Sequence, residues 1–179
     1  NDEYMLSVSR DRNMILYEAV KNNETNAIVS YKAKVQHVNA HKRIIWGCSF
    51  SSDGKYFATG SRDEVVKIWQ GKVENDKIPL ACTLTFENRP VTAVEFVPAN
   101  ADAAAELKYL LAVGFEDGQI ELFAPTAENK WELYLALPIE HVHSETVRRL
   151  RFRWLNSTQL QLVSCSTDFS VRLFDIFTK

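Results

Sequence analysis

Apolar and polar positions recur in the same order four times along the chain. In each unit an apolar run ends at an aspartate, and an aromatic residue follows that aspartate six positions later. The pairs are Asp11 and Tyr17, Asp63 and Trp69, Asp117 and Phe123, and Asp168 and Phe174. Successive aspartates are 52, 54 and 51 residues apart. A repeat of this length indicates an array of similar supersecondary units.

The runs on both sides of each aspartate are rich in β-forming residues, and the later run alternates with a period of two, which is typical of short strands. The runs before the aspartates are Tyr4–Ser9, Tyr56–Ser61, Tyr109–Gly114 and Leu160–Ser166. Those after them are Met14–Tyr17, Val65–Trp69, Gln119–Phe123 and Ser170–Phe174. Asp53-Gly54 and Asp117-Gly118 predict tight hairpin turns, because glycine reaches positive φ without a steric clash.

Further strands complete most units. An earlier strand ends at Phe50, Phe96 or Phe152 in the last three units. A later strand follows in the first three units, at Ala27–Val38, Leu80–Phe86 and Trp131–Ile139. The segment Ala99–Glu106 lengthens one hairpin and predicts an exposed loop or one helical turn. The units therefore contain three, four, four and three strands in order, joined as antiparallel meanders.

The second unit carries four residue types at a specific spacing. His41 lies 22 residues before Asp63, Thr59 lies four residues before it, and Trp69 ends the unit. This set resembles the WD40-repeat family, whose units are four-stranded blades of a β-propeller. The resemblance implies a buried tetrad in which Trp69 donates to Thr59, Thr59 to His41, and His41 to Asp63. A catalytic triad is the alternative for these residues, but no strained nucleophile turn accompanies them.

The other units match the tetrad less well. In the fourth unit His143, Ser164 and Asp168 match, but Phe174 has no N–H to donate. In the third unit only Asp117 remains, because Glu87 and Val113 stand at the histidine and hydroxyl positions.

The fold class is therefore all-β, with about three and a half WD40 blades that form part of a larger propeller. The predicted units are an incomplete blade at 1–38, full blades at 39–86 and 87–139, and a blade without its outer strand at 140–179. Because propellers close with about four to eight blades, we expect other polypeptide to cover the open edges. We also expect a natural C-terminus and a cut or break before Asn1.

Composition limits the classes of function that are compatible with the chain. A net charge of -2 excludes a globally basic nucleic-acid binder. Apolar runs such as Tyr109–Phe115 are far too short to span a membrane, and no signal peptide is evident. Three cysteines favour a reducing compartment, so we expect a cytoplasmic location, with the nucleus as a second.

The sequence predicts no catalytic residues, no metal and no cofactor. His141 and His143 are two residues apart but lack further ligands at metal-site spacing. No C-x-x-C, phosphate-binding loop or dinucleotide fingerprint is present. We interpret the two histidines as loop or tetrad residues.

Basic residues cluster beside two of the turns. We call this set the basic rim: Arg10, Arg12, Lys42, Arg43 and Arg62. Arg10 and Arg62 both directly precede the turn aspartate, and WD40 blades place these turns on one face. Because arginine suits carboxylates and phosphates, we expect the basic rim to bind an acidic protein surface or nucleic acid such as tRNA. The alternative is a solvated loop, or arginine paired with its neighbouring aspartate.

A second basic cluster lies in the fourth unit. Its members are Arg148, Arg149, Arg151 and Arg153. From Arg149 onward they alternate with apolar residues on a predicted inner strand. Packing along the face between blades is the favoured interpretation, and lining of the central channel is the alternative.

Three stretches carry a finer resemblance. His41–Trp69, Tyr4–Glu18 and His143–Phe152 are similar to the family of WD40 subunits of Elongator complexes. The resemblance implies a non-catalytic scaffold that docks subunits 1 and 3 of the complex, whose third subunit modifies wobble uridines of tRNA. A generic WD40 module that binds peptide or nucleic acid through the basic rim is the alternative.

Overall fold

The structure is a computed structural model that describes residues 3–102 and 107–177. Within these residues the chain forms fourteen strands and no α-helix. The strands are β1 (Tyr4–Val8), β2 (Met14–Lys21), β3 (Ile28–His37), β4 (Ile45–Phe50), β5 (Tyr56–Ser61), β6 (Val65–Gln70), β7 (Leu80–Thr85), β8 (Val91–Phe96), β9 (Leu111–Phe115), β10 (Ile120–Pro125), β11 (Trp131–Ala136), β12 (Val147–Trp154), β13 (Gln159–Ser166) and β14 (Val171–Phe177). No helix in the described ranges has the length and apolar character needed to cross a membrane. Part of the predicted loop Ala99–Glu106, residues 103–106, lies outside the described residues.

Each sequence unit forms one antiparallel meander, which we call a blade. The strand orders are β1-β2-β3, β4-β5-β6-β7, β8-β9-β10-β11 and β12-β13-β14 for the first to the fourth blade. The predicted strand numbers per unit and the all-β class are therefore confirmed. Strands that alternate, such as β12, bury one face against a neighbouring blade, whereas β9 is apolar and buried on both faces.

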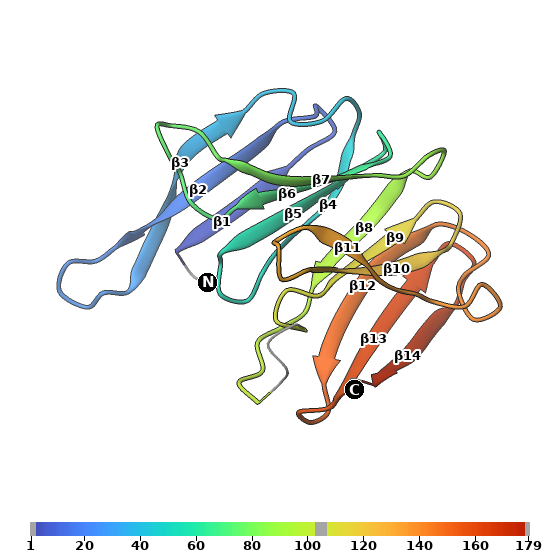
Figure 1. The fold of residues 1–179 in the computed structure, drawn as a ribbon. Helices are drawn as coiled ribbons and strands as arrows, with labels where there is room; N and C mark the ends of the chain where they lie inside the picture. Colours follow the sequence, from blue (N-terminus) through green and yellow to red (C-terminus); the bar gives the residue numbers. More distant parts are fainter. Residues whose placement is uncertain (1–2, 103–106, 178–179) are drawn as a thin grey trace.

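The four blades stand side by side in an open arc rather than a closed ring (Figure 1). Strand β4 packs against β1 and β8, and β8 packs against β12, so adjacent blades meet at their inner strands. The loop before each inner strand and the turn after the next strand come together at one edge of the arc. The backbone amide of Arg62 donates to Ile44 at this edge, and that of Glu116 donates to Pro90, both at 3.0 Å.

The hydrophobic core lies between the blades in three clusters. Met14, Leu16, Ile45, Phe57 and Trp69 belong to the cluster between the first and second blades. Corresponding clusters join the second blade to the third and the third to the fourth. Burial of apolar surface between blades therefore stabilises the arc, and each blade depends on its neighbours.

Two glycines allow this close approach. A Cβ atom added at Gly60 would lie 2.7 Å from Cγ1 of Val91, and one added at Gly114 would lie 2.7 Å from Cγ1 of Val147. Gly60 and Gly114 occupy equivalent places on β5 and β9, and each valine begins the inner strand of the next blade. Because side chains would separate the blades here, glycine sets their spacing.

The residue after each turn aspartate adopts a left-handed backbone conformation. The φ angles are 72° at Arg12, 68° at Glu64, 89° at Gly118 and 63° at Phe169. The turn aspartates accept the backbone amide two residues later in the first, third and fourth blades, at 2.9 to 3.0 Å. Such Asx turns fix the tight reversal even where the left-handed residue is not glycine. At the other predicted turn, Gly54 has a φ of 70°.

Candidate functional site

The structure brings the four tetrad residues of the second blade into one chain of hydrogen bonds. Nε1 of Trp69 donates to Oγ1 of Thr59 at 3.0 Å, and this oxygen lies 2.8 Å from Nε2 of His41. Nδ1 of His41 lies 3.1 Å from both carboxylate oxygens of Asp63. Because the Asp63 carboxylate only accepts, Nδ1 carries the proton given to it, and in a neutral ring Nε2 then accepts from the Thr59 hydroxyl, whose oxygen accepts from Trp69.

This network is shut off from solvent. The side chains of His41, Thr59 and Trp69 are buried. Burial would raise the pKa of Asp63, but hydrogen bonds from His41 and from the Lys42 amide at 2.7 Å outweigh it and hold the pKa below its usual value. The Thr59 hydroxyl is engaged on both sides, so the arrangement ties the loop before β4 to the β5–β6 hairpin.

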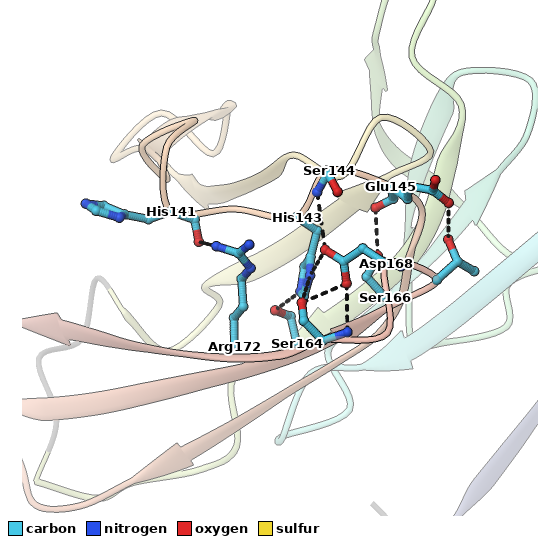
Figure 2. A network of polar contacts seen from close by, with 10 residues as sticks. His141, His143, Ser144, Glu145, Ser164, Ser166, Asp168 and Arg172 are labelled. Carbon is cyan, nitrogen blue, oxygen red and sulfur yellow. Dashed lines mark hydrogen bonds and ion pairs between the residues drawn. The ribbon is translucent and has the colours of Figure 1, made fainter.

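The fourth blade holds a related network (Figure 2). Nδ1 of His143 lies 2.9 Å from Asp168, and its Nε2 lies 2.7 Å from Oγ of Ser164. Phe174 supplies no N–H, but Ser170 adds a hydroxyl that donates to Asp168 at 2.7 Å. Burial would raise the pKa of Asp168, and the hydrogen bonds from Ser170, His143 and Ser144 reverse this and lower it.

His141 and His143 do not act together. His141 lies in the loop, its ring points away from His143, and its carbonyl accepts from Nη1 of Arg172 at 2.8 Å (Figure 2). Across the two described ranges, no group of three or more histidine, cysteine or acidic side chains is placed to hold a metal ion.

The third blade uses a residue that the sequence did not indicate. Arg89 donates through Nε to Asp117 at 3.2 Å and through Nη1 to Glu121 at 2.7 Å. Its guanidinium also lies 3.9 Å from the centre of the Phe115 ring. Arg89 lies 28 residues before its aspartate, whereas the histidines lie 22 and 25 residues before theirs. The only sequence feature that could have indicated this role is the position of Arg89 in the loop before the inner strand.

The basic rim lies on the loops and turns of the first and second blades. All five of its side chains are exposed. Hydrogen bonds join the loop before β4 to the turns that follow β1 and β5. The Ile45 amide donates to the Ser9 carbonyl at 3.4 Å, and the Ser61 hydroxyl donates to the Arg43 carbonyl at 3.3 Å.

The pairing of Arg62 differs from the alternative raised by the sequence. Its partner is not the neighbouring aspartate but Glu116 of the third blade, at 3.9 Å between Nη2 and Oε1. Both side chains are about half exposed, so this ion pair is weak. The other four cations of the basic rim have no carboxylate partner within the described part of the chain. The basic rim therefore keeps most of its positive charge free.

The second basic cluster is not packed between blades as the sequence favoured. All four arginines are exposed. The β12 register shifts between Val147 and Arg149 and places Arg148 and Arg149 both outward, and Arg151 and Arg153 then alternate with buried residues. Arg151 pairs with Glu95 at 2.7 Å. Arg148 lies over the ring of Trp46, 5.7 Å from its centre, which connects the fourth blade to the second.

Comparison with known proteins agrees with the repeat. The family model for the WD domain, G-beta repeat, matches residues 32–70 and 137–175. The chain is 37% identical to Elongator complex protein 2 of Dictyostelium discoideum, 36% to that of Drosophila melanogaster and 38% to that of Arabidopsis thaliana. Each match covers 98% of this chain and 21% or 22% of the relative, so the chain spans about a fifth of these proteins. The chain therefore contains WD40 repeats, and over nearly its whole length it is similar to one section of proteins named Elongator complex protein 2.

Proposed function

We propose that this chain is part of a non-catalytic scaffold subunit of an Elongator complex. In this role it docks subunits 1 and 3 and thereby supports the modification of wobble uridines in tRNA. The observation that carries the proposal is the similarity to Elongator complex protein 2 from several organisms over 98% of the chain. The scaffold acts in the cytoplasm, with the nucleus as a second location.

A scaffold role fits the chemistry of the polar networks. The hydroxyl of Thr59 lies between Trp69 and His41, and the His41 ring lies between Thr59 and Asp63. Each group is buried with its hydrogen bonds made, which suits a rigid support rather than a proton-transfer site. Rigid blades then present their loops to partners.

The basic rim is the docking surface in this proposal. Arg10, Arg12, Lys42 and Arg43 keep free guanidinium or ammonium groups on adjacent loops. An acidic surface of a partner subunit would complement them in charge. Phosphates of tRNA are the second candidate, because the same arginines suit both anions.

The test replaces the rim charges in the full-length protein. We expect the Arg10/Arg12/Arg43/Arg62→Glu variant to fold normally and to lose co-purification with subunits 1 and 3. The matched control, Lys21/Lys32/Lys72/Lys130→Glu, reverses four exposed charges elsewhere and should assemble normally. Normal assembly and normal wobble-uridine modification in the rim variant would refute docking through the basic rim.

A salt titration separates the two partners. Binding to tRNA phosphates releases counterions, so the logarithm of affinity should fall steeply and linearly with the logarithm of salt concentration. Binding to an acidic protein surface depends less steeply on salt. Loss of tRNA binding with intact subunit assembly in the rim variant would favour the tRNA candidate.

A further inference from the structure

A hollow of about 350 Å³ opens on the inner side of the arc. It is bounded by the inner strands β4, β8 and β12 and by the end of β1, so all four blades contribute to its wall. Trp46, Arg148, Arg149 and Arg151 are its large polar or aromatic lining residues. The hollow is distinct from the basic rim, none of whose residues lines it.

The hollow carries an excess of positive charge. Arg151 is neutralised by Glu95, which approaches it to 2.7 Å. Arg148 and Arg149 have no carboxylate partner in residues 3–102 or 107–177. Burial and the nearby Glu95 raise the pKa of Cys48 to about 11, so this lining thiol stays neutral near pH 7. The guanidinium groups of Arg148 and Arg149 therefore remain available for a ligand.

The backbone holds these two groups beside each other. The register shift at the start of β12 directs two consecutive side chains outward, where a regular strand would bury one of them. The indole of Trp46, in the second blade, contacts Arg148 by a cation–π interaction at 5.7 Å. The guanidinium of Arg148 is thus held at the hollow rather than left on a free side chain.

We propose that this hollow is a binding site for a carboxylate side chain of an acidic peptide segment. Arginine presents paired N–H donors that match the two oxygens of a carboxylate. A hollow of about 350 Å³ has room for an aspartate or glutamate side chain on a flexible segment, whereas a folded RNA stem is too wide to enter it. The side of Trp46 that Arg148 covers is not open to a stacking base. The proposal is independent of membership in an Elongator complex.

The test uses the full-length protein and a fluorescein-labelled hexaglutamate peptide, with binding followed by fluorescence anisotropy. We expect Arg148→Gln/Arg149→Gln to weaken binding at least about tenfold while the melting temperature stays unchanged, because both side chains are exposed. The control Lys32→Gln/Lys130→Gln removes the same charge from other exposed positions and should bind like the wild type.

Three results would overturn the proposal. The first is wild-type protein that does not bind the peptide, and the second is equal binding by the arginine variant and the control. The third is tighter binding of a single-stranded RNA oligonucleotide than of hexaglutamate, with the same arginines required. If the peptide does not bind the hollow, the assembly test of the basic rim is unaffected, so the proposal for the hollow and the proposed scaffold function can be refuted separately.

Discussion

His41 and His143 satisfy the same needs in two blades. Each accepts a hydroxyl proton at Nε2 and gives its own proton to a turn aspartate, at distances between 2.7 and 3.1 Å. Arg89 reaches the turn aspartate of the third blade from the same loop. One aspartate position therefore anchors the loop in three blades, through histidine in two of them and arginine in the other.

Removing His41 should destabilise the protein. His41→Ala removes the acceptor of the Thr59 hydroxyl and one donor to Asp63, which costs about 1–3 kcal/mol of unfolding free energy, and thermal denaturation should show a lower melting temperature. His141→Ala is the control, since that exposed ring points away from the network. Unchanged stability of His41→Ala, with loss of an activity alone, would contradict a structural tetrad.

The turn aspartates should govern stability in acid. The pKa values of Asp63 and Asp168 are lowered in the folded state, so the unfolded chain binds more protons at acidic pH. Their contribution is complete above the ordinary pKa of about 3.9 and is lost as pH falls through the lowered values.

Denaturation curves recorded at intervals of about one pH unit, from about pH 2 to about pH 7, measure this loss of unfolding free energy in acid. The stability difference between wild type and Asp63→Asn/Asp168→Asn should be largest at neutral pH and should shrink below about pH 4. Asp76→Asn, in an exposed loop, is the control. A difference that is constant with pH would show that the two carboxylates are not preferentially ionised in the folded state.

At the scale of strands and turns, the repeat could be predicted from the sequence because the same spacing of apolar residues and turn aspartate recurs in each blade. Alternating residues bury one face of many strands, so most strands followed from the sequence with small shifts at their ends. Predicted Ala27–Val38, for example, became Ile28–His37. The strand predicted at Met14–Tyr17 is the exception, since β2 continues to Lys21.

The left-handed residues Arg12 and Phe169 were not predictable, because the aspartate side chain rather than a glycine fixes the turn. Glu64 was not predictable either, and there the carboxylate of Asp63 bonds to His41 and Lys42 instead.

The close approach of blades gives the element-scale prediction. Gly114→Ala should lower the unfolding free energy by about 1–3 kcal/mol, because the new methyl group overlaps Val147. Adding Val147→Ala removes the nearest overlapping atom, Cγ1, and leaves only Cβ of residue 147 at 2.9 Å, so the double variant should be more stable than the sum of the single effects predicts. Additive effects in this double-mutant cycle would mean that Gly114 does not set the blade spacing.

At the scale of the whole molecule, the site depends on contacts between units that sequence spacing does not encode. Arg148 meets Trp46 from two blades away, and Arg62 meets Glu116 across a blade boundary. The register shift that exposes Arg149 in β12 also occurs at the equivalent places in β4 and β8, but no glycine or proline marks it in β12. The location of the basic rim on adjacent loops could be predicted, because it depends only on the place of each residue within the repeat.

Hydrogen exchange on the assembled complex tests docking through the basic rim most directly. Backbone amides should be compared in the free full-length subunit and after subunits 1 and 3 have bound. We predict that protection increases in the three rim segments, at residues 9–13, 41–46 and 61–64, and stays unchanged in the opposite hairpin turn at 51–55. Unchanged exchange in all three rim segments, with new protection confined to other faces of the arc, would contradict a scaffold that docks its partners through the basic rim.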